Sequence, residues 1–260
     1  MHLALGDAYD GLDDREGAIR EWRMGGGSAE LAHRGRAYKE AGDLQAAVYW
    51  CTAATEVAPE SAPAHALLGE VRYKQRMLPQ AVESLERAVA LAPDDPYKRH
   101  TLGLIYMSQG QAESAISEFE RVVEILPNDF PTNLYLASLY LTQDDLDQAA
   151  ASARRAIAGR QHPRAHFVLG TVYRRQGLPQ RAIPELAEAV RLVPIWNQTS
   201  PYRVGKKKLT EYCLALAGAY EDARQPQEAI AAYHAVLNLD PTNAQAAKAL
   251  RRLEQPPESD

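Results

Sequence analysis

Cysteine is scarce in this sequence. Its 260 residues include two cysteines, Cys51 and Cys213, and neither belongs to a CxxC or CxxCH motif. Those motifs mark structural zinc sites and haem attachment, and a disulfide framework needs a larger set of cysteines in a short chain. The two cysteines therefore indicate neither a disulfide scaffold nor a zinc or haem site.

The sequence also lacks a basic excess and long apolar runs. Its net charge of −5 argues against a general nucleic-acid binder. A membrane-spanning helix needs about 18 consecutive apolar residues, and no apolar run in the sequence approaches that length. The first residues also lack the basic region followed by an apolar stretch that marks a signal peptide. We expect no nucleic-acid partner, no membrane span and a cytoplasmic location, or a periplasmic one if an export signal precedes the given chain. Abundant alanine and arginine are typical of a bacterial, GC-rich genome.

Motifs of catalysis and metal binding are missing as well. The sequence contains no GxSxG, HExxH or GxxxxGK[ST] motif, and "VGKKKL" resembles the end of a phosphate-binding loop only superficially. His162 and His166 are four residues apart, but Pro163 lies between them and His162 precedes the expected helix, so they do not share a helix face. Three further histidines fall at different angular positions of successive helices: His33, His65 and His100. The sequence predicts no metal site, no cofactor and no enzymatic activity.

What the sequence does contain is an internal repeat of about 34 residues. One alanine recurs with steps of 29, 34, 34, 34, 33 and 47 residues, at Ala18, Ala47, Ala81, Ala115, Ala149, Ala182 and Ala229. A small residue twelve positions earlier keeps the same steps, at Gly6, Gly35, Gly69, Gly103, Ala137, Gly170 and Ala217. Two such series in one phase do not arise by chance, so we interpret the chain as tandem copies of one structural unit.

Two more residue types mark the units. A tyrosine follows the small residue by three positions, at Tyr9, Tyr38, Tyr106, Tyr140, Tyr173 and Tyr220, and prolines close units at Pro59, Pro93, Pro127, Pro194 and Pro241. Within a unit the apolar residues recur at helical spacing with a break near the middle, which predicts two amphipathic helices, A and B. We expect the small residues where helix A crosses its neighbours closely, and we expect the closing proline to end helix B.

This pattern resembles the tetratricopeptide repeat family, whose 34-residue unit carries L-G-x₂-Y, then A-x₃-F, then P. The segment "TLGLIYMSQGQAESAISEFERVVEILP" matches it almost letter for letter, and the resemblance covers residues 1–243. It implies an all-α, right-handed α-solenoid in which the A helices line a concave groove, and a function in binding other proteins. Repeats that clamp the C-terminal dicarboxylate of chaperones carry paired asparagines and lysines in the groove. That clamp is absent, because the comparable positions hold Leu67, Glu70, Thr101, Leu104, Tyr135 and Ser138.

The repeat positions divide the chain into successive units. The first is incomplete, because five residues are missing after Trp22, where "MGGGS" forms a connector. We expect Leu3, Leu5 and Trp22 to lean on a partner, a preceding segment or a second copy, unless a frayed first repeat is simply tolerated. At the other end, Asn243 is a good N-cap for an amphipathic capping helix. The predicted divisions are 1–27 incomplete first repeat, 28–61, 62–95, 96–129, 130–162 and 163–196 repeats two to six, 197–209 insertion, 210–243 repeat seven, 244–254 capping helix and 255–260 disordered tail.

The resemblance also assigns one face of each A helix to the groove. The middle of this face is apolar and aromatic with basic residues on either side, and Glu221 and Asp222 form an acidic patch at its far end. This composition indicates a protein or peptide partner with apolar anchors and acidic residues. The alternative is that these side chains pack against one another or against the B helices. The predicted groove residues are Arg36, Lys39, Leu67, Tyr73, Lys74, Tyr97, His100, Leu104, Met107, Leu134, Tyr135, Leu141, Phe167, Thr171, Arg174 and Arg175.

The step of 47 residues marks an insertion of 13 residues. Helical spacing after it starts the last A helix near Lys206 and leaves 197–205 as a loop. Lys206, Lys207 and Lys208 then occupy the first turn of a helix, where the macrodipole repels cations by up to about 1 kcal/mol each. Because residues that oppose local stability are candidates for function, Tyr202 and the three lysines form a predicted second surface for an acidic partner or phosphate. The alternative is a solvated loop with solubilising lysines.

These observations predict a non-catalytic scaffold or adaptor that binds a partner segment in its groove. A first alternative is a structural subunit or assembly factor of a larger complex, docked through its N-terminal end and the 197–205 loop. A second alternative is a regulatory partner of a separate enzyme. The open N-terminal end is also a candidate for docking or self-association.

Overall fold

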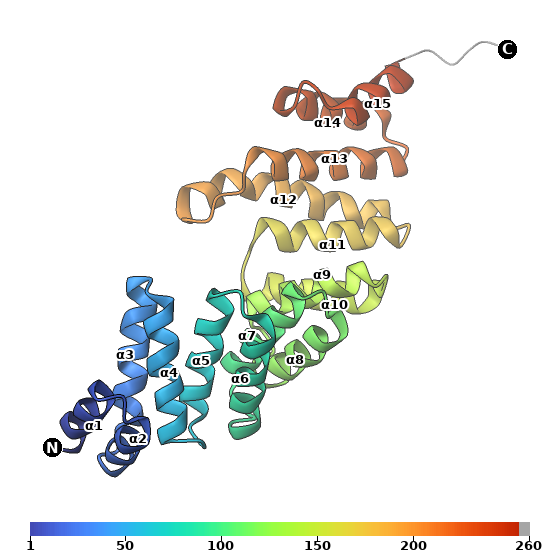
Figure 1. Cartoon of the computed structure of the whole chain (residues 1–260). Coiled ribbons are helices and arrows are strands. Elements are labelled where there is room, and N and C mark those ends of the chain that lie inside the picture. The colour runs from blue at the N-terminus through green and yellow to red at the C-terminus, as the bar shows by residue number, and fades with distance from the viewer. Residues whose placement is uncertain (255–260) are drawn as a thin grey trace. The chain divides into compact units, whose positions relative to one another are not determined.

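The computed structural model describes residues 1–254, which form fifteen helices and no strand (Figure 1). The predicted all-α architecture of tandem helix pairs is confirmed. The chain divides into two compact units, one of residues 1–126 and one that begins at Pro127. The predicted disordered tail, 255–260, lies outside the described residues.

The first unit consists of four helix pairs, each an A helix followed by a B helix. Each pair packs as a hairpin, and within this unit the first three pairs each pack on the following pair (Figure 1). The helices are α1 (His2–Gly11), α2 (Arg15–Met24), α3 (Ser28–Ala41), α4 (Leu44–Val57), α5 (Ala62–Lys74), α6 (Leu78–Leu91), α7 (Pro96–Ser108) and α8 (Ala112–Ile125).

The second unit contains three helix pairs and a final single helix. Its A helices are α9 (Phe130–Thr142), α11 (Pro163–Arg175) and α13 (Lys206–Asp222), and its B helices are α10 (Leu146–Gly159), α12 (Pro179–Thr199) and α14 (Pro226–Leu239). The last helix, α15 (Ala244–Glu254), packs on α14. The Asn243 side chain accepts a hydrogen bond from Ala246 N at 3.0 Å, and Ala246 and Leu250 are buried, so the predicted capping helix is confirmed.

Small residues set the distance between the two helices of a pair. A Cβ atom added to Gly69, Gly103 or Gly170 would lie 2.6 Å from the side chain sixteen residues later, on helix B of the same pair. At Gly103 that neighbour is the ring of Phe119, which is fully buried. A Cβ needs about 3.5 Å or more to a carbon neighbour, so the repeat selects glycine for close helix packing, as its periodicity predicts.

A left-handed residue closes every turn between an A and a B helix. The residues with positive φ in these turns are Asp13, Gly42, Arg76, Gly110, Asp144, Gly177 and Arg224. Their positions keep the steps of the alanine series. Glycine adopts this conformation freely, whereas an L side chain does so at a cost of about 1 kcal/mol. The turn is therefore a fixed part of the repeat even where the residue is not glycine.

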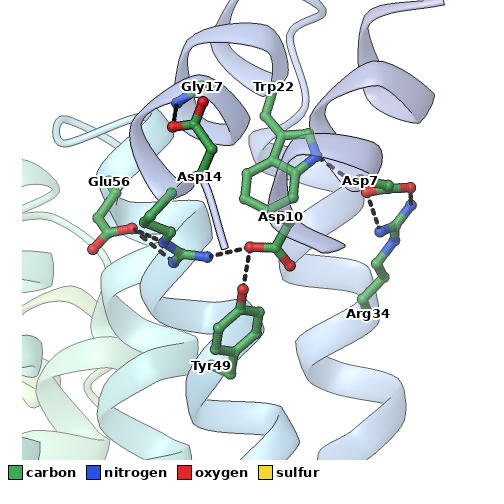
Figure 2. Close-up of polar contacts among 9 residues, drawn as sticks. Asp7, Asp10, Asp14, Gly17, Trp22, Arg34, Tyr49 and Glu56 are labelled. Carbon is green, nitrogen blue, oxygen red and sulfur yellow. Dashed lines mark hydrogen bonds and ion pairs between the residues drawn. The ribbon is translucent and has the colours of Figure 1, made fainter. Parts of the chain in front are cut away.

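The first pair is shorter than the others and is held by polar contacts (Figure 2). Its helices have ten residues each, and Gly25 to Gly27 connect them to α3. Trp22 is fully buried and donates a hydrogen bond to Asp7 Oδ1 at 3.1 Å, and Arg34 donates to the same carboxylate at 2.8 Å. The expectation that Trp22 leans on a partner is wrong, because residues of this chain bury the whole side chain. Leu5, which was expected to make the same kind of contact, is 41% exposed.

A second polar contact of this pair runs through Arg15, which donates hydrogen bonds to Asp10 at 3.3 Å and to Glu56 at 2.7 Å (Figure 2). Tyr49 also donates to Asp10. Since Tyr49 and Glu56 lie on α4, these contacts join the first pair to the second. The hydrogen bond from Arg34 holds the pKa of the Asp7 carboxyl below its ordinary value.

The insertion lengthens three consecutive parts of the second unit. Helix α12 has 21 residues where α10 has 14, and α13 has 17 where α11 has 13. The connecting loop spans 200–205, against 92–95 between α6 and α7. These differences account for all 13 added residues, and α12 visibly extends past the end of α11 (Figure 1).

Pro194 does not end helix B, contrary to the expectation from its repeat position. It lies inside α12, which continues to Thr199, so the predicted loop 197–205 is shorter than expected, whereas α13 does begin at Lys206. Proline removes one hydrogen bond from a helix interior. Packing on both sides of it holds the helix together: Val193 is buried beside Tyr212, and the Trp196 indole donates to Tyr202 O at 2.6 Å.

Candidate partner-binding groove

The predicted groove residues of the first unit are only partly available at the surface. Arg36, Leu67 and Tyr97 line a cavity of about 210 Å³. Leu67 is 4% exposed and forms only its floor, while Tyr97 is 77% exposed. Lys39 is held by Glu70 at 2.8 Å. Among the other predicted groove residues of this unit, Lys74 is exposed. The remaining four are half-buried: Tyr73, His100, Leu104 and Met107.

In the second unit, most of the apolar residues predicted for the middle of the groove pack against other residues of the chain. Leu134 is 6% exposed and belongs to the core, and the Phe167 ring stacks on Tyr212 with centroids 4.5 Å apart. Arg175 donates to Leu141 O at 2.7 Å. Tyr135 and Thr171 are half-buried. Here the structure places several groove candidates in contacts within the chain, as the alternative reading allowed.

Arg174 is positioned by the neighbouring A helix. Its guanidinium lies over Gly218 of α13, where an added Cβ would come within 2.5 Å of Nη2, and its Nε donates to Asp222 Oδ2 at 2.5 Å. The absence of a side chain at Gly218 therefore gives Arg174 room to lie flat on α13. This contact fixes the arginine between α11 and α13.

A cavity of about 770 Å³ runs along α13, and we call it the α13 groove. Helix α13 and Arg174 form one side, and the end of α14 with the start of α15 forms the other. The lining residues are Arg174, Lys206, Lys207, Thr210, Glu211, Leu214, Ala215, Leu239, Asp240, Pro241, Asn243 and Gln245. A second cavity of about 430 Å³ shares Arg174 and Gln245 with it.

The three lysines of the insertion have different surroundings. Lys206 and Lys207 line the α13 groove, whereas Lys208 pairs with Glu211 at 2.7 Å. Tyr202 is 82% exposed on the loop. The structure thus joins two members of the predicted second surface to Arg174 of the predicted groove. Sequence reasoning missed the opposite wall, from Leu239 to Gln245, although the Pro-Thr-Asn turn before the capping helix was a signal for it.

An aromatic cluster holds the lengthened end of α12. The His162 ring packs edge-on against the Trp196 ring, with the two ring centroids 4.2 Å apart, and lies 5.1 Å from the Phe130 ring centroid. On the Trp196 ring lies the Arg160 guanidinium, 4.7 Å from the ring centre. Burial lowers the pKa of His162 to about 4, and the nearby charge of Arg160 adds to this effect. The histidine is therefore a neutral ring at neutral pH, and its Nδ1 accepts the helix N-cap hydrogen bond of α11 at 3.0 Å.

The other histidine of this region is engaged by its own neighbours. His166 is buried, with Glu185 Oε2 2.8 Å from Nδ1 and Gln161 Oε1 2.7 Å from Nε2. Over residues 1–254, no group of three or more His, Cys, Asp or Glu side chains is placed to hold a metal ion. Among the described helices, none combines the length and apolar character needed to cross a bilayer.

Comparison with protein families decides the classification. The tetratricopeptide repeat family models match residues 38–99, 99–129, 134–194 and 213–247, which together cover more than half of the chain. The chain is a tetratricopeptide repeat protein. Tetratricopeptide repeats serve in general as protein-interaction modules, which places this chain among interaction scaffolds in the broad sense.

Solved structures of tetratricopeptide repeat proteins share the fold. YrrB, described as having an unusual peptide-binding site, is 19% identical with a TM-score of 0.58, over 63% of this chain and 85% of YrrB. MamA is 17% identical with a TM-score of 0.61, over 68% of this chain and 97% of MamA. PilF of Pseudomonas aeruginosa is 16% identical with a TM-score of 0.61, over 88% and 97%. No curated protein sequence matches the chain.

Proposed function

We propose that this tetratricopeptide repeat protein is a non-catalytic scaffold that binds a segment of a partner protein in the α13 groove. The observation that carries the proposal is the groove itself. Its volume of about 770 Å³ lies within the range of ligand pockets. Half-buried Leu214, Ala215 and Leu239 form its apolar part, and burial of apolar surface by a partner favours association.

The similarity to YrrB, whose structure has an unusual peptide-binding site, agrees with this proposal in the kind of ligand only. The groove of the present chain depends on its own insertion, which supplies the first turn of α13. The proposal also moves the expected contact. The sequence predicted the main contact in the apolar middle of the groove face, whereas the α13 groove contains only Arg174 of the sixteen predicted groove residues.

A peptide-display selection against the wild-type chain tests the proposal, followed by affinity measurements on two variants. Ala215→Arg places a long side chain in the groove, and Ala231→Arg makes the same change on the exposed face of α14. Arginine is a good helix former, so both variants are expected to fold. We expect selected peptides to lose at least about tenfold in affinity on Ala215→Arg and to bind Ala231→Arg normally. Equal binding to both variants would contradict the proposal.

Ala215→Arg, together with the loop variant Tyr202→Ala, separates the scaffold from the subunit docked through its loop. A subunit held by 197–205 keeps its complex when Ala215→Arg is introduced and loses it when Tyr202 is changed to alanine. A scaffold behaves in the opposite way, because Tyr202 does not line the groove. Co-purification of the complex from the source cells, with each variant in turn, gives the readout.

A further inference from the structure

The charges that line the α13 groove are not balanced. Of its five charged side chains, Arg174 is paired with Asp222 at 2.5 Å and Glu211 with Lys208 at 2.7 Å. Asp240 accepts hydrogen bonds from Thr242 and Asn243, and together with the nearby charge of Lys206 these lower the pKa of its carboxyl. Neither Lys206 nor Lys207 forms an ion pair with another described residue. The charged lining therefore carries an excess of one positive charge, contributed by two lysines outside any ion pair.

The sequence around these lysines reinforces the imbalance. From Ala189 to Thr210 it contains no aspartate or glutamate, although the whole chain has a net charge of −5. This segment includes five cations, of which Arg191 and Lys208 are paired with Glu188 and Glu211. The groove entrance is thus a basic spot on an acidic protein. Such a local excess attracts and orients an acidic partner.

The insertion is what brings the two lysines to the groove. Relative to α11, all four added residues of α13 precede its first shared position, since Ala217 occupies the place that Gly170 has in α11. Gly205 supplies no side-chain cap, so the added turn begins with cations at the helix end that disfavours them. Neither lysine stabilises the helix that carries it.

The order of groups along α13 limits what fits. The two lysines lie at its first turn, and Leu214 is seven residues beyond Lys207. At 1.5 Å per residue this is about 10 Å along the helix, the length of about three residues of extended peptide. A partner with acidic residues at one end thus reaches Leu214 and Leu239 with an apolar side chain about three positions away.

We infer that the α13 groove recognises an extended acidic protein segment in which a pair of carboxylates meets Lys206 and Lys207 and an apolar side chain lies against Leu214 and Leu239. This inference rests on the proposed function and adds the chemistry of the partner. It also explains the insertion, because a repeat of regular length would lack both lysines.

Fluorescence anisotropy with three labelled peptides tests the inference. The first carries Asp-Asp-Ser-Ser-Leu between Gly-Ser flanks, the second has Lys-Lys in place of Asp-Asp, and the third has Ser in place of Leu. We expect the wild-type chain to bind the first peptide at least about tenfold more tightly than either of the others. Added salt weakens this binding, because exposed charges are screened.

Two matched variants assign the effect to the groove lysines. The double variant Lys206→Gln with Lys207→Gln is expected to lower the affinity for the Asp-Asp peptide about tenfold and to remove most of the salt dependence of binding. Arg203→Gln removes a positive charge from the neighbouring loop but outside the groove lining, and is expected to leave the affinity within about twofold of wild type. Equal loss in both variants, no loss in the double variant, or equal binding of the Asp-Asp and Lys-Lys peptides would overturn the inference.

The Ala215→Arg variant separates the two proposals. If display-selected peptides without acidic residues bind and are blocked by Ala215→Arg, the groove is a peptide site but the acidic partner is wrong. If no peptide binding depends on Ala215, both proposals fail. Binding to phosphatidylglycerol vesicles that is lost in the double lysine variant, with no binding of the Asp-Asp peptide, would also overturn the inference in favour of a lipid surface.

Discussion

The junction between α6 and α7 in the first unit and that between α12 and α13 in the second join the same two types of helix in different ways. In the short junction, Asp95 accepts hydrogen bonds from Tyr97 N and Lys98 N and so caps α7. In the long junction, Gly205 provides no side-chain cap and three lysines follow. The short junction thus satisfies its own helix end, whereas the long one relies on packing of Val193 and Trp196. The difference shows that the added residues are held in place by tertiary contacts and not by a capped helix end.

The largest expected effect comes from adding volume in the regular part of the chain. Gly103→Val places a Cβ 2.6 Å from the Phe119 ring, and we expect a loss of about 3 kcal/mol in the free energy of unfolding, because the helices of this pair are already in contact. Gly205→Ala in the long junction is the control, since an added Cβ there has no neighbour within 4 Å. Urea unfolding measures the free energy of unfolding of both variants. Equal losses would show that the two positions are packed equally tightly, contrary to this prediction.

Trp196→Ala is expected to act locally. The indole contacts the His162 ring and holds the loop through its hydrogen bond to Tyr202 O. Because the indole is only partly buried, we expect its removal to lower the free energy of unfolding by about 2 kcal/mol, less than for a fully buried tryptophan. Hydrogen exchange should accelerate in residues 193–209 and stay unchanged in α9 and α10. Tyr202→Ala, which leaves the accepting carbonyl in place, should not accelerate it. Uniform acceleration across the second unit would contradict a locally held extension.

Arg224→Gly is expected to stabilise the chain by about 1 kcal/mol, because glycine adopts its positive φ without the steric cost of a side chain. The change tests whether the turn itself is common to regular and lengthened repeats. Arg76→Gly, at the same turn position in the first unit, should give a similar gain in thermal unfolding. A loss of stability in either variant would show that the arginine makes contacts that outweigh the strain.

The smallest effects distinguish the two helix ends directly. Asp95→Ala in the short junction should cost about 1 kcal/mol, through loss of the N-cap. Lys207→Glu in the long junction should instead raise the free energy of unfolding by about 0.5 kcal/mol, since an acidic residue suits the start of a helix. Thermal unfolding at low salt detects both changes. A stability loss in Lys207→Glu would mean that the lysine supports the fold after all.

The repeat made most of the fold predictable, because the spacing of Gly103, Ala115 and their equivalents follows from contacts between neighbouring helices. The start of α13 at Lys206 and the N-cap Asn243 were readable for the same local reason. Pro194 misled the prediction, because a local rule for proline takes no account of the packing of Val193 and Trp196 on either side.

The candidate site was predictable only in part. The three lysines stood out by opposing the helix dipole, which is a property of sequence position alone. Whether Leu67 and Leu134 face solvent depends on how adjacent helices pack, and the structure buries both. The far wall of the groove comes from Leu239 and Asp240, about thirty residues beyond the lysines. Bringing these segments together is a tertiary event that no local pattern records.

Methyl NMR of the leucine side chains during titration with the Asp-Asp peptide locates the bound segment on the protein. We expect the signals of Leu214 and Leu239 to shift in the wild-type protein, those of Leu136 to stay in place, and the shifts to be lost with Lys206→Gln and Lys207→Gln. Shifts that appear elsewhere, or that persist unchanged in the double variant, would contradict this expectation.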